Sequence, residues 1–171
     1  MCIRVRYVAT LSLGTSTDTY DASGKIIETK EFHALDNNEI VACFNNFIGS
    51  QEQKPPIYSA IKVNGKKLYE YARAGEQVEV PTRSVTVNHL EILQIENNLI
   101  KFKVGCSKGT YIRSLCYDLA KALGYPGHMK DLIRTKSGNF SLENCFTLEQ
   151  IENGEYTTVS LEEALNSYQQ L

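Results

Sequence analysis

Apolar and polar residues alternate along several stretches of the chain, a period of two that is typical of β-strands with one buried face. Residues 4–13 follow this period in part, and residues 26–32 form a short strand that we expect to pair with the first. Residues 83–96 and 99–106 have the composition of two long strands around a turn at residues 97–98. These segments predict a β-sheet.

Spacings of three and four residues predict an amphipathic helix in the segment that follows Asp36. Asp36, with Glu39 three residues later, is close to a capping box, and Gly49 is expected to stop the helix. The apolar stripe consists of Ile40, Phe44, Phe47 and Ile48. We expect this stripe to belong to the core.

A second helix is predicted between Thr110, as its N-cap, and Gly124, as its stop. Its apolar residues are Ile112, Leu115, Leu119 and Leu123. Further along, two capping-box pairs predict short C-terminal helices, namely Thr147 with Gln150 and Ser160 with Glu163.

Residues 53–75 lie between these elements and carry their own turn signals. Two prolines at residues 55–56 force an extended entry, and Asn64-Gly65 is a strong signal for a tight turn. A short helix is expected beyond the turn, ending at Gly75. The segment is therefore predicted to be a hairpin followed by a helix.

The chain of 171 residues, 42% of them hydrophobic, is long enough for one core. The order of elements predicts an α+β fold, with a mixed, mainly antiparallel sheet and flanking helices. No run approaches the roughly 18 apolar residues of a membrane span, and no signal peptide opens the chain. Five cysteines without a Cys-x-x-Cys pair are expected to be reduced. We expect a soluble, cytoplasmic protein without a metal.

Charge is distributed unevenly although the net charge is only −2. Residues 54–73 carry +4 and residues 101–136 carry +6, whereas residues 137–171 carry −6. A concentrated positive surface attracts a polyphosphate and releases its counterions. The two basic blocks are therefore candidate nucleic-acid contacts, or else solvated strand and helix faces. The acidic helical tail, residues 141–171, is not expected to touch RNA.

The sequence CSKGTYIRSL at residues 106–115 has the features of an active-site rim. It places a glycine turn, the phenol of Tyr111 and the guanidinium of Arg113 close together after a predicted strand. A cation near a helix N-terminus is mildly disfavoured by the backbone dipole, so Arg113 suggests an anionic partner, a carboxylate or a phosphate. The alternative is a surface arginine that stacks on its own tyrosine.

Together with QKPPIYSAIKVNGKKLYEYARAG at residues 53–75, this stretch resembles the bacterial tRNA pseudouridine synthase B family. RVRYVATLSLGTSTDTYDASG at residues 4–24 and LIRTKSGNF at residues 132–140 are similar to two further segments of that family. The resemblance covers nearly the whole chain. It implies an isomerase that converts uridine 55 in the T loop of tRNA to pseudouridine, without a cofactor.

The resemblance also implies roles for individual residues. Tyr7 matches a tyrosine that stacks on the target base, Tyr111 a tyrosine that removes the C5 proton, and Arg113 an arginine that pairs with the catalytic aspartate. Leu132 matches a leucine packed beside the uracil. Further substrate-binding residues are all cations, namely Lys62, Lys66, Lys67, Arg73, Lys108 and Arg134.

One family feature is not found in the sequence. The family's nucleophilic aspartate lies in a GxLD motif upstream of the segment that holds Tyr7, and the only Leu-Asp pair, Leu35-Asp36, lacks its neighbours. The family's small RNA-binding C-terminal domain is not recognised either. We therefore expect a partial catalytic domain over residues 1–171, inactive alone, whose Arg113 has lost its carboxylate. A bound anion, self-association or a further N-terminal segment would then complete the site.

Three alternatives remain open from the sequence. The chain is a non-catalytic RNA-binding remnant of the same family, a synthase of the guide-RNA type, or a glycosidase-like enzyme that uses two of its own carboxylates. Lys108 and the hairpin motif argue against the guide-RNA type. The aspartates at residues 18 and 21 offer too few oxygen ligands for calcium. No catalytic pair is singled out by the spacing of Asp18, Asp21, Asp118 and Asp131.

Overall fold

A six-stranded sheet with the order β10-β9-β1-β8-β7-β4 is the centre of the computed structural model, which describes residues 4–169. All neighbouring strands in it are antiparallel. Its strands are β1 (Arg4–Leu13), β4 (Gly49–Gln53), β7 (Arg83–Glu96), β8 (Leu99–Ser107), β9 (Gly127–Ser137) and β10 (Phe140–Ser141). The predicted α+β class with a mainly antiparallel sheet is confirmed.

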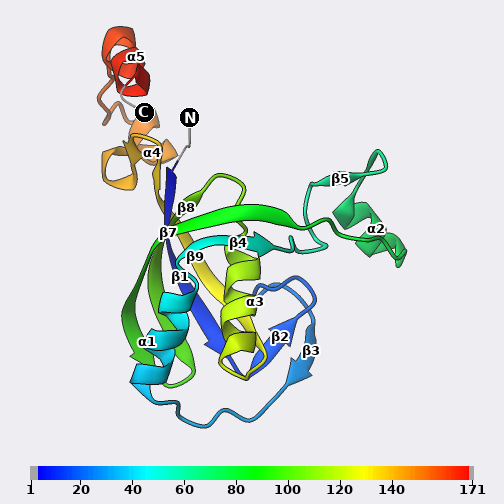
Figure 1. The fold of residues 1–171 in the computed structure, drawn as a ribbon. Coiled ribbons are helices and arrows are strands. Elements are labelled where there is room, and N and C mark those ends of the chain that lie inside the picture. Colours follow the sequence, from blue (N-terminus) through cyan, green and yellow to red (C-terminus); the bar gives the residue numbers. More distant parts are fainter. Residues whose placement is uncertain (1–3, 170–171) are drawn as a thin grey trace.

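Two helices, α1 (Asn37–Asn46) and α3 (Ile112–Ala122), lie side by side on one face of this sheet (Figure 1). The core fills the space between them and the strands, with the ring of Phe44 edge-on to Phe102 at 5.3 Å. Asp36 is the N-cap of α1, because its carboxylate accepts a hydrogen bond from the Asn38 amide at 2.8 Å. Both predicted amphipathic helices are therefore present, and most of their apolar stripes are core. The predicted end of the first helix is wrong, because α1 ends at Asn46, Ile48 lies beyond it and is 45% exposed, and Gly49 begins β4.

The segment between β4 and β7 projects from the sheet as an arm (Figure 1). It consists of β5 (Lys62–Val63), β6 (Lys66–Lys67) and α2 (Leu68–Ala74). Asn64 and Gly65 both have positive φ, as the tight turn requires, and Gly75 ends α2 in a left-handed conformation. The hairpin and helix predicted for residues 53–75 are confirmed.

The predicted pairing of residues 26–32 with the first strand is wrong. β3 (Ile26–Thr29) pairs instead with β2 (Thr15–Thr17), a short strand that the sequence did not predict. The reason is that both edges of β1 are occupied, one by β8 and the other by β9. A strand has only two edges, so no edge of β1 is left for β3 to pair with.

Beyond the sheet the chain forms η1 (Leu142–Asn144), α4 (Leu148–Glu152) and α5 (Leu161–Gln169). The capping boxes at Thr147 and Ser160 begin α4 and α5 as predicted. The two helices extend away from the rest of the molecule (Figure 1). Within residues 4–169, no helix is both long and apolar enough to cross a membrane.

Helix α3 packs so closely on the start of β9 that a side chain at Gly127 has no room. A Cβ built there would collide with the Cβ of Ala120 and approach the Ser12 carbonyl oxygen to 3.0 Å. We expect Gly127→Ala to lower the free energy of unfolding by about 1 to 3 kcal/mol, the usual cost of overpacking a core. Urea unfolding followed by circular dichroism measures this.

Gly105→Ala is the matched control, because a Cβ there meets only His89 at an ordinary 3.5 Å. Equal destabilisation by the two substitutions would contradict the close approach of α3 and β9.

Candidate functional site

The N-terminal end of α3 holds Tyr111 as its N-cap and Arg113 in its first turn. The predicted N-cap, Thr110, is wrong. Its hydroxyl instead donates to the Ser107 carbonyl at 2.9 Å and so closes the turn between β8 and α3. Tyr111 is capped by another segment, since its amide donates to Oε1 of Gln53 at 2.8 Å.

Arg113 joins three segments that are distant in the sequence. Its Nη1 donates to the carbonyl of Thr19 at 3.0 Å and to Oδ2 of Asp21 at 3.3 Å, and its Nη2 donates to the carbonyl of Tyr58 at 2.9 Å. The side chains of Arg113 and Asp21 are 21% and 22% exposed, so the ion pair is largely shielded from water. The expectation that Arg113 lacks a carboxylate is therefore wrong, and its predicted anionic partner is Asp21.

Asp21 is held as an anion by its neighbours. Its Oδ1 accepts hydrogen bonds from the hydroxyl of Thr19 at 2.8 Å and from both the amide and the hydroxyl of Ser23. Burial by itself would raise the pKa of this carboxyl, but the hydrogen bonds from Ser23 and Thr19 and the charge of Arg113 outweigh it. The pKa of Asp21 is lowered below its ordinary value of 3.8.

The loop that carries Asp21 is fixed from two sides. Tyr20, which has a positive φ of 62°, turns the chain sharply between the two residues that contact Arg113. Its carbonyl accepts from the Met129 amide of β9 at 2.9 Å, and its ring stacks on Tyr117 of α3 at 4.2 Å. The loop is therefore bound to β9 and to α3 at the same time.

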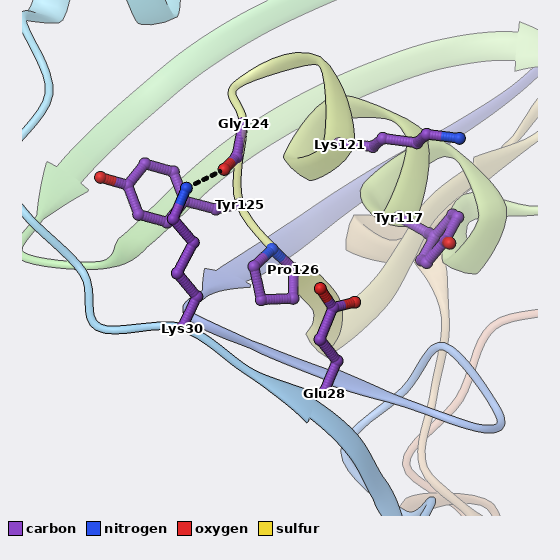
Figure 2. Close-up of a pocket in the computed structure, with 7 residues that line it drawn as sticks. All are labelled: Glu28, Lys30, Tyr117, Lys121, Gly124, Tyr125 and Pro126. Atoms are coloured by element: carbon purple, nitrogen blue, oxygen red, sulfur yellow. Dashed lines mark hydrogen bonds between the residues drawn. The ribbon is translucent and has the colours of Figure 1, made fainter.

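Lys30, which directly follows β3, attaches the β2–β3 hairpin to the C-terminal end of α3 (Figure 2). Its Nζ donates to the Gly124 carbonyl at 2.7 Å and lies 4.5 Å from the centre of the Tyr125 ring. A cation at a helix C-terminus is favourable because the last carbonyls point toward it. An open hollow of about 360 Å³ lies beside this contact, and Glu28, Tyr117 and Lys121 also line it.

Tyr7, Leu132 and Arg134 form a second group on the sheet face that α3 covers. Tyr7 of β1 is opposite Arg134 of β9, whose guanidinium carbon lies 5.4 Å from the centre of the tyrosine ring. Leu132 is opposite the buried Ala9 and is 40% exposed. Because cross-strand partners share a face, these side chains point to the same side as the core residues of β1. The structure thus brings together three of the residues that the sequence predicted.

The cations of the arm are interleaved with tyrosines. Lys67 and Arg73 both lie over the ring of Tyr69, at 5.4 and 5.2 Å, and Lys66 lies over Tyr71 at 4.6 Å. Lys66 also forms an ion pair with Glu76 at 2.9 Å.

Two other predicted cations lie on turns or strands near these elements. Lys62 is an exposed residue of β5, and Lys108 is exposed in the turn between β8 and α3. In the described residues, no group of His, Cys, Asp and Glu is arranged to hold a metal ion.

Sequence reasoning missed two residues of the site. Asp21 is rejected in the sequence analysis both as a metal ligand and as part of a catalytic pair, although it lies in the TDTYD segment that carries the resemblance. Gln53 is the first residue of the motif at residues 53–75, and nothing in the local pattern links it to Tyr111, 58 residues away. Only the fold reveals that contact.

Comparison with known proteins agrees with this arrangement. Residues 4–112 match the model described as TruB family pseudouridylate synthase (N terminal domain), and residues 113–169 match the model described as tRNA pseudouridylate synthase B C-terminal domain. The fold is thus that of a pseudouridine synthase. The chain belongs to the TruB family, the tRNA pseudouridine synthase B family.

Several relatives named tRNA pseudouridine synthase B are similar to this chain. That of Oceanobacillus iheyensis is 52% identical over 85% of the chain and 49% of its own length, and that of Clostridium tetani is 45% identical over 96% and 58%. That of Bacillus subtilis is 46% identical over 94% and 56%. The chain therefore spans about half the length of the curated relatives it matches.

Solved structures with this fold come from larger assemblies. The structure described as a Cbf5-Nop10-Gar1 complex matches 88% of this chain and 35% of its own, with a TM-score of 0.64 and 28% identity. One described as an H/ACA RNP bound to a substrate RNA containing 2'-deoxyuridine matches 88% and 36%, with a TM-score of 0.57 and 25% identity.

The lowered pKa of Asp21 makes a prediction about stability. A carboxyl whose pKa is lower in the folded than in the unfolded chain stabilises the fold at pH values above its unfolded-state pKa. This stabilisation is lost as the pH falls through the folded-state pKa. We expect Asp21→Asn to be less stable than the parent at pH 7 by about 1.5 to 3 kcal/mol, the range for hydrogen bonds to charged groups. The difference should shrink between pH 5 and pH 2.

Urea unfolding of the two proteins at pH 7, 5, 3 and 2 tests this expectation. As a control, Asp21→Asn should cost less in an Arg113→Met background, because one partner is already gone. A difference that stays constant from pH 7 to pH 2 would show that the ion pair does not stabilise the fold.

Proposed function

We propose that this chain is the RNA-binding and base-holding part of a tRNA pseudouridine synthase that acts on uridine 55 in the T loop. The observation that carries the proposal is the anchored guanidinium of Arg113 within a chain of this family. It lies at the start of α3, next to Tyr111, and three acceptors fix its orientation. A guanidinium held in this way can orient a second carboxylate or a phosphate that approaches its free side.

Pseudouridine formation breaks the bond between N1 of the uracil and C1' of the ribose, turns the base and joins C5 to C1'. The reaction requires a nucleophilic carboxylate, a base for the C5 proton and a surface that retains the detached uracil. In our proposal Tyr111 accepts the C5 proton, Tyr7 stacks on the extruded base and Leu132 packs beside it. Arg134, over the ring of Tyr7, faces the RNA backbone.

Asp21 is not the nucleophile in this proposal. Its Oδ1 already accepts three hydrogen bonds and its Oδ2 contacts Arg113, so the anion is stabilised and its lone pairs are engaged. The hydrogen bonds and the contact with Arg113 both lower the pKa of the Asp21 carboxyl, and both make its carboxylate a weaker nucleophile. Asp21 instead orients Arg113, and the attacking aspartate belongs to a GxLD segment that this sequence does not contain. The chain alone is therefore inactive.

The arm supplies the RNA contacts. Lysines and arginines position a nucleic acid through its phosphates, and adjacent aromatic rings offer surfaces on which splayed loop bases can stack. Lys62, Lys66, Lys67 and Arg73 all lie on this arm, and three of them cover tyrosine rings. Lys108 adds a positive charge close to Tyr111 in the sequence. This chemistry suits a folded stem-loop better than a small-molecule substrate.

The bacterial type of synthase is favoured over the guide-RNA type. Identity to the relatives named tRNA pseudouridine synthase B is 45–52%, against 25–28% to the chains of the ribonucleoprotein assemblies. A non-catalytic RNA-binding protein of the same family is the second candidate, supported by the missing GxLD motif. A measurement of pseudouridine formation distinguishes the synthase from the non-catalytic protein.

The RNA-binding prediction concerns the arm. The chain should bind a T-arm stem-loop with an affinity that falls as salt rises, because each neutralised phosphate releases counterions. The double substitution Lys66→Glu and Lys67→Glu should weaken binding and reduce the salt slope by about 1 for each lost contact. Glu76→Gln should strengthen binding, since it releases Lys66 from its ion pair.

Fluorescence titration at several salt concentrations measures these effects. The double substitution Lys101→Glu and Lys103→Glu on β8 makes the same charge reversal outside the arm and should change affinity little. If it weakened binding as much as the arm substitutions do, long-range charge rather than the arm would account for binding.

The activity prediction concerns the nucleophile. Residues 1–171 alone should release no tritium from tRNA that carries 5-tritiated uridine. Joining the chain to the segment of a relative that contains GxLD should produce release, and Arg113→Ala in the joined protein should lower its rate by about 100-fold, a typical loss when a catalytic group is misplaced. Lys101→Gln in the joined protein is the control for a surface change. Rapid release by the chain alone would refute the assignment of the missing nucleophile.

A further inference from the structure

Gln53 makes an unusual pair of hydrogen bonds with one residue. It is the last residue of β4 and is 3% exposed. Its Nε2 donates to the Tyr111 carbonyl at 3.1 Å, and its Oε1 accepts from the Tyr111 amide at 2.8 Å. One buried side-chain amide therefore satisfies both polar groups of the Tyr111 backbone, as a neighbouring strand would.

The residues that follow Gln53 hold the next residues of α3. The Lys54 carbonyl accepts from the hydroxyl of Ser114 at 2.7 Å, and the Tyr58 carbonyl accepts from Arg113. The segment 53–58 thus binds three of four consecutive residues at the start of the helix.

The same segment continues into the arm. The carbonyl of Ser59 accepts from the Tyr69 amide at 3.1 Å, and the carbonyl of Ile61 accepts from the Leu68 amide at 2.8 Å. These two bonds attach the start of α2 to residues 59–61. Residues 53–61 therefore connect α2 in the arm to Tyr111, through hydrogen bonds at both ends of the segment and its backbone between them.

We propose that Gln53 is a positioning residue, which fixes Tyr111 in the place where it meets the target base. Its side chain bonds the backbone of Tyr111, so it acts through that residue. Tyr111 needs this support because it precedes the helix, with ψ of 109°, and its own side chain forms no capping hydrogen bond. A small rotation there would move the phenol, and catalytic groups lose much of their effect when displaced by about 1 Å. The inference rests on the proposed function for the role of Tyr111.

The experiment uses the chain itself and three variants. Gln53→Met keeps the volume of the side chain and removes both hydrogen bonds. Gln53→Glu keeps the acceptor but turns a carboxylate oxygen toward the Tyr111 carbonyl. Gln51→Met is the matched control, because Gln51 lies on the same strand and its Nε2 donates to Phe47 at 3.1 Å, away from Tyr111.

The first measurement is the amide hydrogen-exchange protection of Tyr111, with its ring signals, by NMR. Gln53→Met should lower the protection by about five- to tenfold, as the loss of a hydrogen bond implies, whereas Gln51→Met should leave it unchanged. Gln53→Glu should resemble Gln53→Met at neutral pH. On acidification the protonated acid can again donate and accept, so protection should return in this variant alone.

The second measurement compares affinity for a T stem-loop that contains uridine at the target position with affinity for one that is abasic there. Gln53→Met should bring the ratio of the two affinities closer to one while the salt slope stays the same, because the phosphate contacts of the arm are intact. A change of fold in general would alter both quantities.

Each result decides a separate question. The positioning role is overturned if the Tyr111 amide is as well protected from exchange in Gln53→Met as in Gln51→Met. It is also overturned if acid does not restore the protection of this amide in Gln53→Glu. An unchanged ratio of affinities in Gln53→Met overturns it as well. If the parent chain binds neither stem-loop, the proposed function fails, and the exchange measurement still decides whether Gln53 fixes Tyr111.

Discussion

The guanidinium of Arg113 is the interaction on which the arrangement of the site depends. Three segments of the chain meet at it: the loop between β2 and β3, the segment that leads into the arm, and α3 itself. Two of its three acceptors are backbone carbonyls, which would be costly to leave without a donor at a partly buried place. Since Arg113 also pairs with Asp21, the same side chain satisfies the backbone of two loops and fixes the charge at the centre of the site.

The sheet determines where these loops meet. β1 lies in the middle with β8 and β9 on either side. Ala9 and Leu11 of β1 and Phe102 of β8 belong to the core that α1 and α3 share with the sheet. The two family models meet between Ile112 and Arg113, yet the fold has no boundary there, because β9 of the second matched region pairs with β1 of the first. The site is formed by both regions, so neither one alone would hold Arg113 against Asp21.

The arm and the sheet have different energetics. The sheet residues are stabilised by burial, whereas the arm buries little apart from Leu68 and exposes cations on tyrosine rings. Such exposed cations and rings contribute little to folding, and in the proposed function they contact phosphates and bases. The arm therefore depends on residues 53–61 for its attachment, and the same residues hold Tyr111 and Arg113. The position of the arm and the order at the start of α3 therefore depend on one structural element, residues 53–61.

The sequence by itself determined the elements whose signals are local. The N-cap of Asp36, the turn at Asn64 and Gly65, the capping box at Thr147 and the alternation of the long strands depend on neighbours a few residues away. The tertiary structure alone decided which strand β3 pairs with, what caps Tyr111 and which carboxylate Arg113 meets. The last two contacts join residues 58 and 92 positions apart. All three depend on strand order and register, which local periodicity does not encode.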